Sequence, residues 1–261
     1  MTIYTEDGMR QYEILERERK RQGKTLQQVA AGVYSLSMLR RIETGIRLAG
    51  KLEKDRIMAR LGIPRGVEAE YLPYKEYRAW QMRQAIVQSI ARRDLDKLEG
   101  QLAEYEKQAG CRKLEKQFLE VARYMFLKLQ EAPKSVLQKT IKKAVDYTIL
   151  DVEEALAGRL ILDVQELFIL QEYAWLHEKE SGICTEKFCE LYREPECYCI
   201  NEVIKERRKA LGMSRRELAK DICSEKTIER LENYGTTAQM YVVIRVFKRL
   251  GIGDKMLNKG N

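Results

Sequence analysis

The residue types that most often carry enzyme chemistry are scarce in this sequence. Its 261 residues include a single histidine, His177, so a catalytic triad or a two-histidine zinc motif is excluded or confined to that position. Neither a GxxxxGK[ST] nor a GxGxxG phosphate-binding loop occurs. The sequence therefore contains no recognisable set of catalytic residues, and we expect neither enzyme activity nor a cofactor.

Six cysteines are the remaining reactive side chains, and four of them crowd into residues 184–199: Cys184, Cys189, Cys197 and Cys199. Their Cys-x4-Cys and Cys-x-Cys spacings differ from the paired Cys-x2-Cys spacing of structural zinc sites. Free thiols are the ordinary state in a reducing compartment. Ordinary reduced cysteine is therefore the prediction, and a metal site or a redox-sensing thiol stays open as an alternative.

The net charge of the chain is +8, and it is distributed unevenly. Arg10–Ile63 carries +7 and Ile200–Asn261 carries +6, whereas Pro64–Cys199 carries −3. Locally concentrated positive charge favours contact with nucleic-acid phosphates. Solvated helix faces explain the same charges equally well, so charge alone does not decide between the two interpretations.

The composition favours an all-α protein. Hydrophobic residues make up 44% of the chain, enough for packed cores, while four prolines and 16 glycines are few for the many turns of a sandwich or barrel. No segment approaches the roughly 18 apolar residues of a membrane span, and Met1–Arg10 lacks the zones of a signal peptide. We therefore expect a cytoplasmic protein.

An internal repeat organises the two basic ends. A shift of 189 residues aligns Leu15–Ile63 with Ile204–Ile252 without a gap, and 13 of the 49 positions are identical. Apolar positions match in kind as well, which indicates two copies of one small domain. The identical pairs include Arg19/Arg208, Ser35/Ser224, Arg41/Arg230, Glu43/Glu232, Arg56/Arg245 and Arg60/Arg249.

Each copy has the pattern of a bundle of short helices. In the first copy the pattern predicts a helix over Gln11–Gln22, a second over Leu26–Ala31 capped by Thr25, and a third from Ser35 to Thr44. Gly23 and Gly45 end the first and the third helix. Two short helices joined by a tight turn, the second of them exposed, make a helix-turn-helix.

The segments KTLQQVAAGVYSLSMLRRIETG (Lys24–Gly45) and MSRRELAKDICSEKTIERLENY (Met213–Tyr234) resemble the XRE, or Cro/repressor-like, DNA-binding domain. The turn is one residue shorter than in the commonest form, which is more similar to the Rgg/PlcR-type regulators. In those regulators an XRE head precedes paired, tetratricopeptide-like helices that often sense peptides. The resemblance covers both ends strongly and the middle only in outline.

The resemblance implies a role for each polar residue of the first copy. The third helix lies in the major groove, the start of the second helix meets phosphates, and Leu36 contacts a thymine methyl. Arg41 and Glu43 have a second interpretation, an internal salt bridge that involves Arg17 or Arg19. The expected base-facing residues are Ser35, Leu36, Ser37 and Arg40, the expected phosphate contacts at the second helix are Thr25 and Gln27, and further backbone contacts are Arg41, Arg47 and Lys51.

The second copy is a weaker candidate for DNA reading. Its third helix exposes Glu225 and Glu229 beside Lys226 and Arg230, and its helix-stop glycine is replaced by Tyr234. Arg215 and Arg216 are nevertheless well placed for phosphates, and a glutamate can accept a hydrogen bond from cytosine N4. Direct DNA contact and a dimerisation or packing module remain equal alternatives here.

The middle of the chain has the pattern of antiparallel helical pairs. We predict helices over Tyr74–Arg92, Leu95–Gln108, Lys113–Gln130, Lys134–Leu156, Val164–Lys179 and Glu186–Tyr192. They are similar to tetratricopeptide repeats without a clean 34-residue signature. The groove of such pairs suits a peptide or a second subunit, whereas a plain dimerisation scaffold is equally compatible, since residues 64–199 contain no asparagine to clamp a peptide. The predicted domains are 1–66, 67–199 and 200–261.

Together these features predict a sequence-specific transcription regulator that binds double-stranded DNA as a homodimer on an inverted repeat. One short recognition helix reads too few bases for useful specificity by itself. A protein- or peptide-binding adaptor whose terminal bundles serve as scaffold is the alternative, and a thiol- or metal-responsive switch is the third hypothesis.

Overall fold

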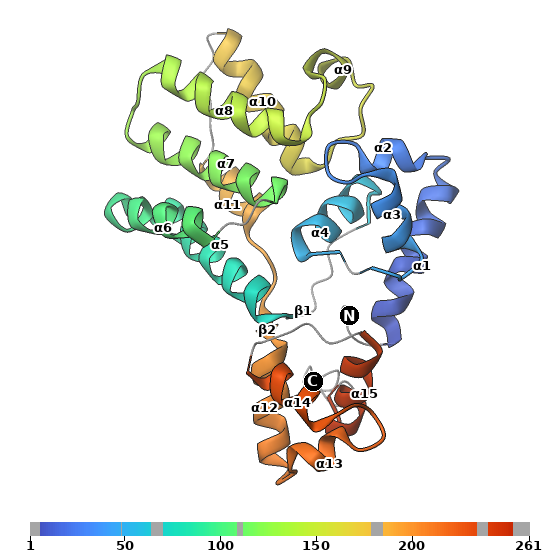
Figure 1. Cartoon of the computed structure of the whole chain (residues 1–261). Helices are drawn as coiled ribbons and strands as arrows, with labels where there is room; N and C mark the ends of the chain where they lie inside the picture. The colour runs from blue at the N-terminus through green and yellow to red at the C-terminus, as the bar shows by residue number, and fades with distance from the viewer. Residues whose placement is uncertain are drawn as a thin grey trace, which may run out of the picture. The chain divides into compact units, whose positions relative to one another are not determined.

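The structure is a computed structural model, and it describes residues 6–47, 49–63, 70–108, 112–178, 185–233 and 240–252. In these residues the chain is almost entirely helical, which confirms the predicted all-α class, with one small two-stranded sheet (Figure 1). Every helix in the described ranges is too short or too polar to serve as a membrane span.

The described residues form two compact units. The helical unit holds residues 14–65 and 79–194, and the C-terminal unit holds β1, β2 and the helices that follow β2, together with residues before Ile14 and from Glu70 to Arg78. The three predicted domains stay a prediction.

The first sequence copy, Leu15–Ile63, lies in the helical unit, and its first helix, α1, begins at Glu6, before the predicted Gln11. Three short helices follow α1 and are joined by tight turns. Their bounds are α1 (Glu6–Arg21), α2 (Leu26–Ala30), α3 (Leu36–Glu43) and α4 (Lys51–Arg60).

The rest of the helical unit is a succession of longer helices around one apolar core. Helix α7 packs on α6 and α8, and α8 packs on α10. Tyr105, Tyr124 and Phe188 are the largest fully buried side chains of this core. The helices are α5 (Tyr74–Arg92, in this unit from Ala79), α6 (Leu95–Gln108), α7 (Lys113–Leu129), α8 (Lys134–Thr148), α9 (Val152–Leu156), α10 (Val164–Glu178) and α11 (Thr185–Tyr192).

One predicted helix, over Lys134–Leu156, is two helices in the structure. The backbone of Ile149 is extended, which ends α8, and Asp151 then acts as the N-cap of α9. The Asp151 carboxylate accepts a hydrogen bond from the Glu154 NH at 2.9 Å. The apolar residues keep helical spacing across this break, so their pattern predicted one continuous helix. The N-cap Asp151 sets the real boundary.

The second sequence copy lies in the C-terminal unit. Strand β1 (Glu70–Leu72) pairs in parallel with β2 (Cys197–Cys199), with Tyr71 opposite Tyr198. The Tyr71 ring packs edge-on against Phe247 at 5.4 Å between ring centroids, which ties the sheet to the helices. Those helices are α12 (Ile200–Ala210), α13 (Arg215–Ala219), α14 (Glu225–Glu232) and α15 (Met240–Leu250).

Candidate nucleic-acid interface

Side-chain caps fix the two short helices of the first copy. Thr25 Oγ1 accepts from the Gln28 NH at 3.1 Å, and Gln28 Oε1 accepts from the Thr25 NH at 2.8 Å, which closes a capping box at α2. Ser35 Oγ accepts from the Met38 NH at 3.3 Å and caps α3. Both predicted caps are confirmed.

The turn between α2 and α3 presents one face of α3 outward. Val29, Leu39 and Ile42 are fully buried between the two helices. Gly32 occupies the left-handed region at φ +73°, which a short turn here requires. Because the apolar side of α3 faces inward, its polar side is exposed from Ser35 to Arg41.

The second copy repeats this geometry in detail. Ser214 and Glu217 form the same capping box at α13, and Ser224 caps α14 by accepting from the Thr227 NH at 3.2 Å. Asp221 stands at the position of Gly32 and takes the same left-handed backbone, with φ +59°. The repeated sequence therefore folds into two helix-turn-helix elements of the same design.

An arginine from the first helix of each copy holds the glutamate that ends the third helix. Arg19 Nε and Nη2 donate to the Glu43 carboxylate at 2.7 and 2.9 Å, and the hydrogen bond raises the pKa of Arg19. Arg208 holds Glu232 in the same way. The structure thus places Glu43 in an internal ion pair with Arg19.

The second glutamate has an additional partner. Arg215 Nε donates to Glu232 Oε2 at 2.9 Å. Burial would raise the pKa of Glu232, but the hydrogen bonds from Arg208 and Arg215 outweigh burial and lower it. Arg215, expected to meet phosphate, is therefore partly committed inside its own domain.

A matched arginine on the last helix of each copy donates hydrogen bonds to backbone carbonyls at the start of the turn. Arg60 Nη1 donates to the carbonyl oxygens of Val29 at 2.9 Å and Ala31 at 2.6 Å. Arg249 Nη1 donates to Leu218 O at 3.2 Å and to Lys220 O, the equivalent carbonyls of the second copy. These bonds satisfy carbonyls that the end of a helix leaves without a partner.

Most of the predicted contact residues of the first copy lie together and are exposed. They surround the start of α2 and the outer side of α3, so one surface presents hydroxyl, amide and guanidinium donors. The exposed residues are Thr25, Gln27, Ser35, Leu36, Ser37, Arg40, Arg41 and Arg47.

Lys51 does not lie on this surface. It is 3% exposed, and its ammonium lies 2.9 Å from Asp55 Oδ2 and 3.6 Å from Glu194 Oε2. A buried ammonium between two carboxylates cannot reach a phosphate, so its predicted role is corrected to a structural one.

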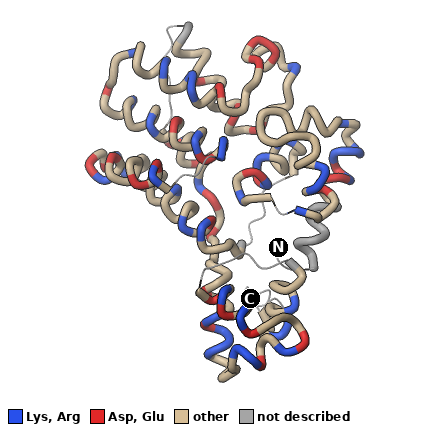
Figure 2. Tube along the Cα trace, in the orientation of Figure 1, with Lys and Arg blue, Asp and Glu red and all other residues tan. Residues whose placement is uncertain are grey.

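The outer side of α14 carries both signs of charge. Lys226 and Arg230 are exposed, and so are Glu225 and Glu229, while Arg216 is exposed on α13. Figure 2 shows basic and acidic residues interspersed along the helices of this copy. The two copies thus expose different chemistry on equivalent faces.

A family model described as Helix-turn-helix matches residues 204–254. Residues 204–254 are a helix-turn-helix domain. The matched residues span most of α12 through α15. The first copy lies outside the matched residues, and its assignment relies on the internal repeat and the shared caps, ion pairs and turn. Comparisons with curated proteins and with solved structures give no match.

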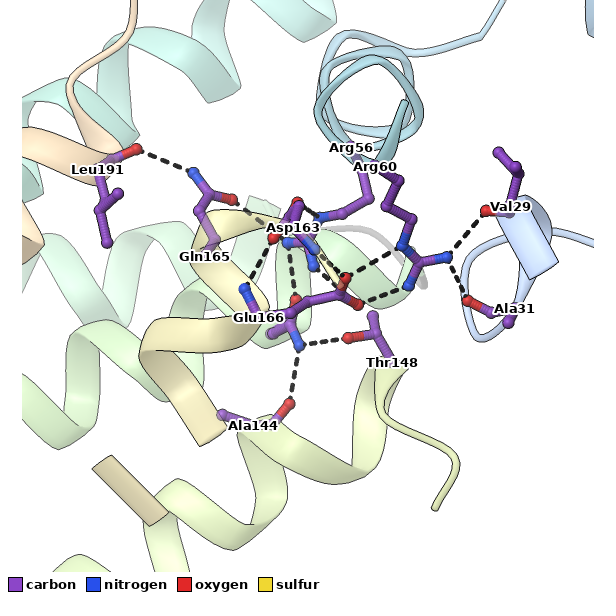
Figure 3. A network of polar contacts seen from close by, with 11 residues as sticks. Val29, Ala31, Arg56, Arg60, Ala144, Thr148, Asp163, Gln165, Glu166 and Leu191 are labelled. Atoms are coloured by element: carbon purple, nitrogen blue, oxygen red, sulfur yellow. Dashed lines mark hydrogen bonds and ion pairs between the residues drawn. The ribbon is translucent and has the colours of Figure 1, made fainter. Parts of the chain in front are cut away.

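A buried ionic network attaches α4 to α10 inside the helical unit, and sequence reasoning missed it (Figure 3). Arg56 Nε lies 2.5 Å from Asp163 Oδ2, and Arg60 Nε and Nη2 lie 3.0 and 2.6 Å from the Glu166 carboxylate. Burial would raise the pKa of Glu166, yet the charges of Arg56 and Arg60 lower it.

A hydrogen bond joins the two acids as well, since the Glu166 NH donates to Asp163 Oδ1 at 2.7 Å. Figure 3 shows Arg60 as the bridge between the carbonyls at the end of α2 and the carboxylate on α10. The only sequence signal was the Arg56/Arg245 and Arg60/Arg249 identity, which does not reveal the acidic partner.

The cysteines the structure describes are free thiols. Cys189, Cys197 and Cys199 are buried, and burial raises the pKa of the Cys199 thiol. Within the described ranges, no group of three His, Cys, Asp or Glu side chains is arranged to hold a metal ion. Cys111, Cys184, Tyr234 and the side chain of His177 fall outside those ranges, so the predictions for them stay predictions.

Proposed function

We propose that the chain is a sequence-specific DNA-binding transcription regulator whose first helix-turn-helix reads an inverted repeat in a homodimer. The observation that carries the proposal is the family match of residues 204–254 together with the repetition of that domain's caps, ion pair and turn in the first copy. The proposal places the regulator in the cytoplasm.

In this proposal α3 enters the major groove by its N-terminal end. Ser37 and Arg40 reach base edges, and Leu36, which is 48% exposed, meets a thymine methyl. The capped start of α2 presents its backbone NH groups and Gln27 to a phosphate. Arg41 and Arg47 add contacts to the DNA backbone.

The C-terminal domain has a different part in the proposal. Its Lys226 and Arg230 contact DNA beside Glu225 and Glu229, which accept hydrogen bonds from cytosine amino groups. Carboxylates repel phosphates, so this domain contributes less affinity than the first copy and reads a different sequence.

Selection of bound sequences from random duplex DNA tests the proposal. The wild-type chain is compared with a Ser37→Ala, Arg40→Ala variant, and a Lys226→Ala, Arg230→Ala variant serves as the matched pair in the second copy. We expect the wild type to enrich an inverted repeat, because a symmetric dimer presents two identical recognition helices. The first variant loses or relaxes the repeat, and the second variant retains it.

Two outcomes contradict the proposal. An unchanged repeat with the first variant, lost with the second, moves the reading surface to α14. No enrichment at low salt removes the DNA-reading function and favours an adaptor.

The helical middle is the proposed regulatory part, similar to the tetratricopeptide-like region of Rgg/PlcR-type regulators, where a peptide or protein binds. The observation that favours the alternative, a protein-binding adaptor, is the apolar exposure of Leu156, Val164 and Leu167 on α9 and α10. Salt separates the two functions, because binding through phosphates weakens steeply as salt rises and apolar docking does not.

A further inference from the structure

The docking of α4 on α10 uses a short sequence that occurs twice in the helical unit with one residue changed. Ile161–Glu166 reads ILDVQE, and it supplies both carboxylates of the network that holds Arg56 and Arg60. Twelve residues earlier, residues 149–154 read ILDVEE. Both segments use the aspartate to accept the NH of the glutamate three residues on.

The earlier segment presents its acids to solvent. Asp151 is exposed, and the Glu154 carboxylate is engaged by Arg159 at 2.6 Å in an ion pair whose side chains are 41% and 61% exposed. An exposed ion pair stabilises little and exchanges its partners readily. Leu150 beside the acids is 70% exposed. The segment is thus a docking motif without the buried partner that its twin has.

The C-terminal domain carries the complementary half of this contact. Arg245 and Arg249 on α15 are the equivalents of Arg56 and Arg60 on α4, and both are exposed. Tyr241, one turn before Arg245 on the same helix face, is 55% exposed.

The guanidinium group of Arg249 makes the same backbone contacts as that of Arg60. In both arginines Nη1 binds the carbonyls at the end of the preceding short helix. In Arg60 the remaining edge, Nε and Nη2, binds Glu166. Within the described residues the same edge of Arg249 and the guanidinium of Arg245 meet no carboxylate.

We propose that α15 of one chain docks on residues 149–154 of a second copy, with Arg245 and Arg249 on Asp151 and Glu154 and with Tyr241 against Leu150. The contact reuses the geometry that joins α4 to α10 within one chain. Two such contacts, exchanged between the copies, close a two-fold dimer. This inference deepens the proposed function by naming the surface of its homodimer, and its test contains no DNA, so the two can fail separately.

Charge reversal on each side tests the contact in the full-length chain. Glu154→Lys leaves the Asp151 cap in place, and Arg245→Glu leaves the Arg249 bonds to the turn intact. Molar mass is measured by sedimentation over a range of protein concentrations, with circular dichroism as the check of folding. We expect a dimeric wild type and a dimer dissociation constant raised roughly 10- to 100-fold in each single variant.

The decisive sample is an equimolar mixture of the two single variants. In a mixed dimer, α15 of the Glu154→Lys copy meets the unchanged residues 149–154 of the Arg245→Glu copy. One of the two contacts is then the wild-type contact, so dimer forms again in part. Asp146→Lys and Lys209→Glu, reversals at exposed positions on α8 and α12, are the controls that leave the mass unchanged.

Three results would overturn the proposal. The wild type is monomeric at every concentration, or the single variants stay dimeric, or the mixture remains monomeric. The last result would place the contact within one chain rather than between two.

Discussion

At Gly32 the backbone of the first helix-turn-helix lies close against the helical middle. A Cβ built there would lie 2.0 Å from the carbonyl oxygen of Thr148, and φ is +73°. We expect Gly32→Ala to lower the free energy of unfolding by about 2–4 kcal/mol, because left-handed strain and overpacking add.

Gly23→Ala is the matched control for this measurement. Gly23 has φ +64°, and a Cβ there meets open space among the described residues. In chemical denaturation, Gly23→Ala should lower the free energy of unfolding by only about 1 kcal/mol, which is the cost of the left-handed backbone. Equal losses in the two variants would show that the approach to Thr148 is not a tight one.

Glu172 makes the stability of the helical unit depend on pH. Burial raises the pKa of this carboxyl to about 7, and the Tyr124 hydroxyl at 2.9 Å and the Lys128 ammonium at 3.8 Å only partly oppose it. The folded chain holds this proton more tightly than the unfolded chain, so its contribution is full below pH 4.5 and is lost as pH rises toward 7.

Glu172→Gln removes the titration and keeps an acceptor for Tyr124. The free energy of unfolding of the variant minus that of the wild type should increase by about 3 kcal/mol from acidic to neutral pH, because only the wild type loses stability over this range. Urea unfolding at a series of pH values measures this difference. A difference that stays constant with pH would mean that Glu172 titrates near its ordinary value.

At the scale of the elements, one carboxylate, that of Glu166, contacts both arginines that attach α4 to α10. Glu166→Ala removes the carboxylate that pairs with the buried Arg60 and leaves Arg56 with Asp163, since the side chain of Glu166 is fully buried. We expect a loss of about 3–5 kcal/mol, because an uncompensated buried charge costs far more than an exposed one.

Glu16→Ala serves as the control, since Glu16 pairs with Lys20 at 2.8 Å on the exposed side of α1. Thermal unfolding should leave this variant within experimental error of the wild type. If Glu166→Ala also unfolds within experimental error of the wild type, apolar packing rather than the ionic network holds α4 in place.

The elements also show how far sequence reasoning extends. The caps at Thr25 and Ser35 and the bounds of α5 and α6 depend on neighbouring residues, so local patterns predicted them. The network could not be predicted, because Arg60 and Glu166 are 106 positions apart and charged pairs at that distance leave no pattern. Lys51 was misplaced for the same reason, since its burial involves the distant Glu194.

At the scale of the whole molecule, DNA binding should depend strongly on salt. The logarithm of the binding constant falls linearly with the logarithm of salt concentration, by about 0.9 for each phosphate neutralised. We expect Arg41→Ala, Arg47→Ala to reduce this slope by about 2 in fluorescence anisotropy with the selected operator. Lys20→Ala, on α1, is the control, and an unchanged slope in the double variant would show that these arginines do not contact phosphate.

The pairing of β1 with β2 has a consequence for synthesis and for truncated fragments. β1 is synthesised before the helical middle, and its partner β2 is synthesised after it. The C-terminal unit can therefore form its sheet only after residues 197–199 leave the ribosome. A fragment cut at the limits of the family match, residues 204–254, loses both strands and leaves Phe247 without the Tyr71 ring. The length of chain that is recognisable as a domain is thus shorter than the length that must be present for it to fold as it does here.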